Sequence, residues 1–351
     1  MRFYEYMDIP GIDHLLRDNC CFWIVKQVVS VARQLGKEQI LSELYGATGW
    51  KTTLEEYKQV GDWQALFGIN LRCPHLAWYT MKGEAKRDYP ASISYHLAGW
   101  QEYRYLEDYF SRIHVFLEKG EEKEELLVIC PIESVWAMSY SGAYGGLESR
   151  DSVIKQIEDE YERLFGILTK NQIGFDYGEE ALMEQHASVK DGFLRIGGCS
   201  YKKVIVCGMH TMRSSTLELL GEFQNKGGVV VFIGMAPEYV DAEPSGEVLC
   251  MAEHAVQIPF EERQIVKACQ EERILSVSGE GCEDILVCKR EGSLGANYML
   301  LNQNRKKGHE KICLQFGDKE LFYKAQVLEE WNARTGEVVT LPFEKTKDGC
   351  I

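Results

Sequence analysis

The sequence predicts an α/β protein, and three patterns along its 351 residues predict it. Apolar segments of strand length alternate with segments of helical periodicity through most of the chain. In the first part, the order strand, helix, strand, long loop and helix indicates parallel strands joined by right-handed crossovers, as in a barrel or a doubly wound sheet. After about Asp284, strand patterns follow one another without helices. We therefore expect α/β units followed by a β-rich region.

Local signals define the predicted elements of the first part. The apolar residues between Phe22 and Leu35 recur at helical spacing, and Gly36 is a usual helix stop. Thr53 with Glu56 three residues later forms a capping box, which predicts the start of a second helix. The predicted elements are, in order, helix Phe22–Leu35, strand Gln39–Leu44, helix Thr53–Phe67, strand Ile69–Cys73 and helix Gln101–Leu117.

A long segment without periodicity, Leu76–Trp100, follows the second predicted strand and the pair Pro74 and His75. The segment is rich in Tyr, Trp, Lys and Arg, as is typical of a loop that faces a ligand. It is therefore a candidate binding loop.

The charged run Glu118–Glu125 marks a predicted boundary, because charge-dense stretches seldom lie inside a core. Beyond it, buried strand patterns and amphipathic helices predict a small doubly wound α/β domain. Its predicted strands are Leu126–Cys130, Ile173–Tyr177, Lys203–Cys207 and Val229–Ile233, and its helices are Val153–Leu168 and Thr216–Gln224. The strands of the β-rich region are Ile285–Lys289, Asn297–Leu301, Lys311–Phe316, Gln326–Trp331 and Val338–Leu341. The predicted domains are residues 1–120, 121–280 and 281–351.

The composition argues against several functions. A formal net charge of −15 disfavours a nucleic-acid partner, since phosphate binding needs a basic face. No apolar run approaches the roughly 20 residues that cross a bilayer, and the first residues lack a basic region followed by an apolar stretch. We therefore expect no membrane partner and a cytoplasmic chain. The 12 cysteines include no Cys-x-x-Cys pair, which favours reduced and mostly buried thiols.

Several short runs resemble one enzyme family. They are DIPGIDHL (Asp8–Leu15), SELYGATGW (Ser42–Trp50), DWQ (Asp62–Gln64), GIN (Gly68–Asn70), PH (Pro74–His75), KRDYP (Lys86–Pro90) and WNARTGEV (Trp331–Val338). In order and spacing, the chain resembles glycoside hydrolase family 106, the α-L-rhamnosidase-like enzymes. The resemblance implies a carbohydrate substrate and cleavage of terminal α-L-rhamnosyl residues with inversion. It also implies a barrel site that can involve calcium, and no other cofactor.

The resemblance further implies the domain types. A complete barrel of eight strands takes about 250 residues, whereas about 120 precede the charged boundary. We therefore expect a partial (β/α) barrel, corresponding to the C-terminal part of the catalytic domain. A glutamine-amidotransferase-like domain would follow it, and then an incomplete β sandwich. The chain is accordingly expected to be a fragment of the full enzyme.

Glu43 is the candidate catalytic residue. Glycoside hydrolysis needs two carboxyl groups that flank the scissile bond, one to protonate the leaving oxygen and one to activate water or attack the sugar. Glu43 ends a predicted barrel strand, where barrel enzymes carry catalytic residues, and it lies in the best-matched run. The alternative is a carboxylate that only fixes the following glycine-containing loop through backbone N–H groups.

Asp8, Asp13 and His14 lie around a Pro-Gly turn and are expected on the same face as Glu43. Asp13 and His14 are candidate contacts to sugar hydroxyls, and the aspartates are also candidate metal contacts. The alternative is a turn-forming role, because Asp side chains commonly bond to nearby backbone. Asp13 is a candidate partner for Glu43, whereas the resemblance implies that the second catalytic carboxylate lies upstream. In that case the chain would be inactive alone.

Further candidate substrate contacts follow the second predicted strand. His75 ends it and could hydrogen-bond a sugar hydroxyl, although a lone His is more often structural. The rings of Trp50, Trp78 and Trp100 could stack on the apolar face of a sugar, and Trp50 is favoured because it lies in a family run. The loop beyond His75 holds four more candidates, Tyr79, Lys82, Arg87 and Asp88.

Two other functions stay open. The chain could be a non-catalytic, truncated relative that binds carbohydrate or a partner chain. It could also be a hydrolase that uses Cys207, because amidotransferase-like folds can pair a Cys nucleophile with a His. Cys207 lacks the Gly-x-Cys-x-Gly elbow of such nucleophiles, so a buried core thiol is the favoured interpretation. The sequence does not determine the oligomeric state.

Overall fold

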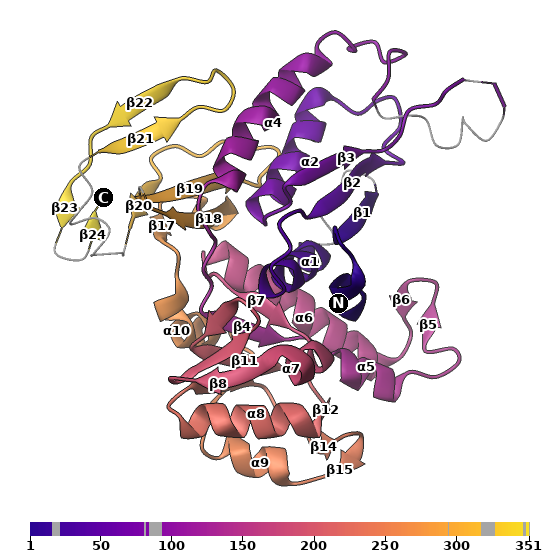
Figure 1. The fold of residues 1–351 in the computed structure, drawn as a ribbon, viewed down its shortest axis with the longest axis vertical. Coiled ribbons are helices and arrows are strands. Elements are labelled where there is room, and N and C mark those ends of the chain that lie inside the picture. Colours follow the sequence, from indigo (N-terminus) through magenta and orange to yellow (C-terminus); the bar gives the residue numbers. More distant parts are fainter. Residues whose placement is uncertain are drawn as a thin grey trace. The chain divides into compact units, whose positions relative to one another are not determined.

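In the computed structural model, the described residues are 1–15, 22–80, 82–83, 93–293, 295–316, 327–346 and 349–350 (Figure 1). They form two compact units, each assembled from segments that are far apart in the chain. Unit 1 comprises Met1–Tyr6, Ser30–Gly36 and Glu124–Arg273, and unit 2 comprises Met7–Val29, Lys37–Lys123 and Ile274–Ile351. The expected division into three consecutive domains stays a prediction.

Unit 2 carries a parallel sheet made of the strands β1 Gly11–Leu15, β2 Leu41–Gly46 and β3 Leu71–Pro74, in the order β1-β2-β3. Strands β2 and β3 begin two residues later than their apolar patterns predicted. Just ahead of them, the Asn70 side chain accepts a hydrogen bond from Ile40 N at 2.8 Å and donates one to Glu38 O at 2.7 Å. A side chain therefore replaces part of the strand ladder there. The described strands of this sheet form an open sheet and no closed barrel.

The three helices predicted for the first part are confirmed as α1 Phe22–Gln34, α2 Leu54–Leu66 and α4 Tyr103–Glu118. The capping box at the start of α2 is also confirmed. The Thr53 hydroxyl accepts a hydrogen bond from Glu56 N at 3.2 Å, and the Glu56 carboxylate accepts one from Thr53 N at 2.8 Å. The start of α2 is thus defined by hydrogen bonds between residues that are close together in the chain.

Helices α2 and α4 pack on one face of β2. Gly61 permits their close approach, because a Cβ at this position would overlap the Phe110 ring of α4. From β3, the Arg72 guanidinium lies 3.9 Å from the centre of the Phe110 ring and pairs with Glu107 at 2.8 Å. The buried cluster that results consists of Leu44, Tyr45, Tyr57, Val60, Tyr103, Leu106 and Phe110.

The C-terminal part of unit 2 consists of antiparallel strand pairs, in the region where strand patterns follow one another without helices. The longest pair is β18 Ile285–Gly292 with β19 Gly295–Asn302. The others are β17 Ser276–Ser278 with β20 Cys313–Gln315, β21 Leu328–Trp331 with β22 Val338–Leu341, and β23 Lys345–Thr346 with β24 Gly349–Cys350; the short helix η3 Cys282–Asp284 precedes β18. Within the described ranges these pairs stay separate, so the expected sandwich stays a prediction.

Unit 1 is built around a five-stranded parallel sheet. Its strands are β4 Leu126–Ile129, β7 Asp176–Gly178, β11 Lys203–Cys207, β13 Val229–Ile233 and β16 Val256–Ile258, in the order β16-β13-β11-β4-β7. Counted along the chain, this is the order 2-1-3-4-5 found in doubly wound sheets, whose winding direction reverses between the first and third strands. That topological switch point here lies between β4 and β11. The predicted α/β architecture with parallel strands is confirmed, whereas the likeness to amidotransferases stays a prediction.

Helices α6 Ser152–Lys170 and α8 Ser214–Asn225 lie on opposite sides of this sheet (Figure 1). The other elements of unit 1 are η1 Arg2–Tyr6, α5 Ile132–Met138, β5 Tyr144–Gly145, β6 Glu148–Ser149, α7 Glu180–His186, β8 Ala187–Lys190, β9 Phe193–Ile196, β10 Cys199–Tyr201, β12 Thr211–Met212, β14 Tyr239–Val240, β15 Glu243–Pro244, α9 Glu247–Ala252, α10 Glu262–Ala268 and η2 Gln270–Glu272. Across the described ranges, helices of sufficient length and hydrophobicity to traverse a bilayer are absent.

Asp176, the first residue of β7, is the centre of a buried polar cluster in unit 1. Its carboxylate accepts hydrogen bonds from Arg33 Nη1 at 2.7 and 2.8 Å, from Ser30 Oγ at 3.2 Å and from Tyr201 OH at 3.0 Å. Gln34 Nε2 donates to the same tyrosine hydroxyl at 2.9 Å. The cluster ties the last residues of α1 to β7 and β10.

Candidate active site

Asp13, Glu43 and Cys73 form a row across the unit 2 sheet. Asp13 pairs in register with Glu43, and Glu43 pairs with Cys73. Paired residues of neighbouring strands lie about 4.8 Å apart and project from the same face of a sheet. Asp13 and Cys73 are exposed and Glu43 is half-buried, whereas Leu44 projects from the opposite face into the cluster with α2 and α4. The sheet thus brings two candidate carboxylates side by side.

Glu43 lies within β2 and not at its end. The strand continues through Tyr45 and Gly46, whereas the apolar pattern predicted an end near Leu44. The expectation that Glu43 occupies the tip of a strand is therefore wrong, because β2 continues from Leu44 to Gly46 after it. Its carboxylate accepts no hydrogen bond from the described residues of the following loop, so the alternative role as a loop anchor has no support from the geometry.

The loop after β2 is held by its own side chains. Thr48 Oγ1 donates to Tyr45 O at 2.8 Å, and Thr52 Oγ1 donates to Thr48 O at 2.9 Å. Tyr45 has a φ of 71°, in the left-handed region that most residues avoid. This turn directs the chain away from the sheet and places Trp50 in the loop, where its side chain is 41% exposed.

His75 lies at the carboxyl edge of the sheet. Its backbone N donates to Leu44 O at 2.7 Å, which extends the ladder between β2 and β3 by one bond. A Cβ on Gly46 would lie 3.4 Å from the His75 ring and 2.8 Å from Leu15, so glycine lets both side chains close over the end of β2. His75 Nδ1 is buried without a hydrogen-bond partner among the described residues. A ligand at this edge would therefore meet Nε2.

His14 occupies the other face of the sheet. Its side chain is only 3% exposed, its Nδ1 lies 2.7 Å from Gln64 Nε2, and its ring makes an edge contact with Trp63 of α2. The expectation that His14 and Asp13 share one face is wrong, because both lie in strand β1, where successive side chains alternate. The geometry favours a structural role for His14, and its role as a sugar contact stays an untested prediction.

The remaining candidates lie in the long loop. Tyr79 is fully exposed. Trp50 and Trp78 are in contact, with ring centroids 5.6 Å apart, whereas Trp100 stacks on Tyr103 at the start of α4. Lys82 is exposed, and Arg87 and Asp88 lie outside the described residues.

Cys73, which lies beside Glu43 in the row across the sheet, was not identified as a candidate from the sequence. A signal for it exists. The runs Leu41–Leu44 and Leu71–Pro74 begin alike, and Cys73 takes in the second run the position that Glu43 takes in the first. Aligning the two strand patterns by position would have found it.

Calcium, implied by the family resemblance, requires six to eight oxygen ligands. Within the described ranges, no group of three or more His, Cys, Asp or Glu side chains is arranged to hold a metal ion. The row of Asp13, Glu43 and Cys73 therefore does not fit a calcium site.

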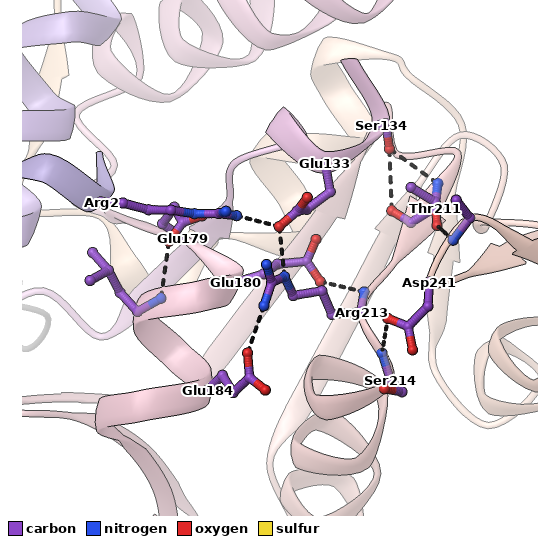
Figure 2. A network of polar contacts seen from close by, with 12 residues as sticks. Arg2, Glu133, Ser134, Glu179, Glu180, Glu184, Thr211, Arg213, Ser214 and Asp241 are labelled. Atoms are coloured by element: carbon purple, nitrogen blue, oxygen red, sulfur yellow. Dashed lines mark hydrogen bonds and ion pairs between the residues drawn. The ribbon is translucent and has the colours of Figure 1, made fainter. Parts of the chain in front are cut away.

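A ligand could also bind in unit 1, at the switch point between β4 and β11, because doubly wound sheets bind ligands there. The polar side chains at this edge bind one another instead (Figure 2). Glu133 accepts a hydrogen bond from Arg213 Nε at 2.6 Å and also pairs with Arg2. Ser134 Oγ accepts a hydrogen bond from Thr211 N at 3.1 Å, which ties helix α5, after β4, to strand β12, after β11. These contacts favour a structural role for this edge.

The geometry of Cys207 argues against a nucleophile. The side chain is buried, and burial together with the nearby Glu160 carboxylate raises the pKa of the thiol well above its usual range. Burial also raises the pKa of Cys130, which follows β4, to about 11. Since the thiolate is the reactive form, both thiols are inert near neutral pH. This supports the interpretation of Cys207 as a core thiol.

Iodoacetamide is expected to label the exposed thiols of the folded protein, Cys73, Cys250 and Cys313, and to leave Cys130 and Cys207 unmodified. Peptide mass spectrometry after a short reaction at pH 7.5 (about 1 unit below the pKa of a free thiol) would measure this. Treatment in urea is the control that exposes all thiols. Labelling of Cys207 as fast as Cys250 in the folded protein would contradict its burial.

No protein-family model and no curated protein matches the chain. Its fold is that of glycoside hydrolases of known structure. A rhamnosidase from Novosphingobium sp. PP1Y is similar over 99% of this chain and 33% of its own length, with a TM-score of 0.71 and 15% identity. A β-galactosidase from Bacillus circulans sp. alkalophilus is similar over 99% of this chain and 60% of its own length, with a TM-score of 0.64 and 13% identity.

The chain thus spans between one third and about three fifths of these enzymes. At such identities the likeness shows the fold alone. A glycoside hydrolase fold is accordingly established, and membership of family 106 in particular stays a prediction.

Proposed function

We propose that the chain is part of a glycoside hydrolase that cleaves terminal α-L-rhamnosyl residues, with Glu43 as a catalytic carboxylate. The observation that carries the proposal is the register pair of Asp13 and Glu43 on the sheet face opposite Leu44 and α2. The glycoside hydrolase fold supports the reaction class. The resemblance of the run Ser42–Trp50 to family 106 supports the choice of sugar.

Glu43 acts in this proposal by proton transfer, either to the leaving oxygen or from the attacking water. Inverting enzymes hold their two carboxyl groups about 6.5–9.5 Å apart, whereas strand neighbours stand only about 4.8 Å apart. Asp13 therefore fits a contact to a sugar hydroxyl beside Glu43 better than the second catalytic role.

His75 and Trp50 complete the proposed sugar site. His75 lies at the carboxyl edge of the sheet beside Gly46, where its Nε2 can bond a hydroxyl. Trp50 offers an exposed ring face in the next loop, on which the apolar face of a neighbouring sugar ring of the substrate can stack. Carbohydrate is the proposed partner of the chain.

The test is hydrolysis of 4-nitrophenyl α-L-rhamnopyranoside by the full chain. Glu43→Gln is expected to lower kcat about 10²–10⁴-fold, because it removes the group that transfers the proton. Asp13→Asn is expected to raise KM more than it lowers kcat. Glu55→Gln, which alters an exposed carboxylate of α2, is the control and should leave both constants unchanged. Equal and measurable rates for wild type and Glu43→Gln would remove Glu43 from the chemistry, whereas no turnover by either protein would favour a truncated, inactive relative.

The alternative function is a non-catalytic relative that binds carbohydrate. It predicts saturable binding of L-rhamnose without turnover of the aryl rhamnoside. Calorimetric titration with L-rhamnose measures binding independently of catalysis, and turnover of the aryl rhamnoside then separates the two functions.

A further inference from the structure

Three segments that are separate in the sequence bring aromatic rings together beyond the carboxyl ends of β2 and β3. The ring centroids of Trp50 and Trp78 lie 5.6 Å apart with an interplanar angle of 57°. Those of Trp78 and His96 lie 6.2 Å apart at 59°. Both distances fall in the range of aromatic pairs in direct contact. All three residues belong to unit 2, and Trp78 is the middle ring of the cluster.

This cluster leaves much of its aromatic surface in contact with water. Trp50 is 41% exposed, and the neighbouring Tyr95 is 68% exposed, with its ring 3.9 Å from that of His96. His96 is also exposed, whereas Trp78 is half-buried beneath these neighbours. Contiguous exposed aromatic surface on a loop is typical of a binding surface, since burial of those rings would otherwise be favourable.

The orientation of His96 is fixed by a buried hydroxyl. Ser94 Oγ accepts a hydrogen bond from His96 N at 3.2 Å and lies 3.3 Å from His96 Nδ1. Ser94 itself is 5% exposed. Because Nδ1 faces Ser94, Nε2 lies on the opposite edge of the imidazole ring, where a ligand can meet it. The cluster therefore offers aromatic faces with one directed polar atom at their rim.

Such a surface matches one class of ligand. A pyranose ring presents an apolar C–H face, which stacks on aromatic rings, and a rim of hydroxyls, which bond to a group such as an imidazole nitrogen. The cluster lies on loops beyond the strands, whereas Glu43 lies within β2. A ring bound on the cluster would therefore be a different ring from the one cleaved next to Glu43.

We propose that Trp50, Trp78 and His96 form a platform that binds the leaving-group sugar ring of the substrate. The proposal rests on the proposed glycosidase function and deepens it, because it states that the substrate is an oligosaccharide or a disaccharide glycoside. The two loops supply the platform with little loss of freedom on binding, since Thr48 and Thr52 hold the loop of Trp50 in place and Ser94 holds His96.

The test compares two substrates that share the cleaved sugar. The first is an α-L-rhamnosyl-D-glucose disaccharide, and the second is methyl α-L-rhamnoside, which has no second ring. Trp78→Ala is expected to lower kcat/KM for the disaccharide about tenfold, because a ring-stacking contact is lost, and to leave the methyl glycoside unaffected. The matched control is Trp100→Ala, which removes a tryptophan that stacks on Tyr103 outside the platform. This variant should leave kcat/KM unchanged for both substrates.

A binding measurement keeps this test independent of turnover. Calorimetric titration with the same disaccharide is expected to give a Kd about tenfold weaker for Trp78→Ala than for wild type. His96→Phe retains the stacked ring and removes the polar atom, so it should weaken binding less than His96→Ala does.

The outcomes separate the two proposals. Binding that depends on Trp78 without any turnover by wild type would keep the platform and favour the non-catalytic relative over the glycosidase function. Turnover of both substrates with equal sensitivity to Trp78→Ala would keep the catalytic role and overturn the platform. Wild type that does not bind the disaccharide, or a folded Trp78→Ala variant that binds it equally well, would also overturn the platform.

Discussion

Asp176→Ala is expected to lower the free energy of unfolding of the protein by about 3–5 kcal/mol, because it leaves the largely buried Arg33 guanidinium without its counter-charge. The Asp176 side chain is fully buried, and it is the acceptor for Arg33, Ser30 and Tyr201 at distances of 2.7–3.2 Å. Removing it also leaves two hydroxyl groups without that acceptor, which adds to the cost. Urea denaturation followed by circular dichroism would measure the loss.

The control for this prediction is Asp159→Ala. Asp159 forms an exposed pair with Lys155 one helical turn away, and solvent screens such a pair strongly. This variant should unfold at the same urea concentration as wild type. If Asp176→Ala lowered the urea concentration of unfolding no more than the control does, the buried cluster would not stabilise unit 1.

Glu180→Gln is expected to remove a large part of the pH dependence of stability between about pH 4.5 and pH 7. Glu180 is buried at the start of α7, and burial raises its pKa to about 7. The Glu133 carboxylate also raises it, whereas the hydrogen bond from Arg213 N, the Thr216 hydroxyl and the Arg213 cation lower it (Figure 2). Burial therefore outweighs the favourable partners of the charged form.

The direction of this pH dependence of stability follows from proton binding. Between the unfolded and folded pKa values of Glu180, the folded protein binds more protons than the unfolded chain, so stability falls as the pH rises. The contribution is fully present below about pH 4.5 and is lost as the pH passes through about 7. The total change is on the order of 3 kcal/mol.

Urea denaturation of wild type and Glu180→Gln at pH 5 and pH 8 (on either side of a pKa of about 7) would measure this. Wild type should lose more stability than the variant between the two conditions. Glu218→Gln, which changes an exposed carboxylate of α8, should follow wild type. If wild type and Glu180→Gln lost the same stability between these two pH values, the folded protein would not hold an extra proton at Glu180.

Elements with local signals could be predicted closely. The strands Lys203–Cys207 and Val229–Ile233 were predicted with the bounds that β11 and β13 have, because uninterrupted β-branched and apolar runs are typical of strands buried on both faces. The start of α2 followed from the capping box of Thr53 and Glu56. The starts of β2 and β3 were predicted less accurately, since the Asn70 side chain replaces part of the ladder by hydrogen bonds that no apolar pattern reveals.

Of the candidate site, the sequence indicated the residue types but not their arrangement. Glu43, Asp13 and Trp50 were identified, but the pairing of Asp13 with Glu43 depends on the register between β1 and β2. His14 was assigned to the wrong face because a turn was expected where the chain forms strand β1. The contact between Trp78 and His96 joins two parts of a segment that has no periodic pattern.

The sequence by itself determined the α/β class, the positions of the longer helices and of several buried strands, and the resemblance that points to sugar cleavage, because these depend on side-chain patterns over a few neighbouring residues. Only the tertiary structure decided which carboxylates are neighbours, which histidine is buried, and that Asp176 and Arg33 form a pair 143 residues apart. Such contacts depend on strand register and helix packing, which are set by the burial of many side chains at once and leave no local pattern in the chain.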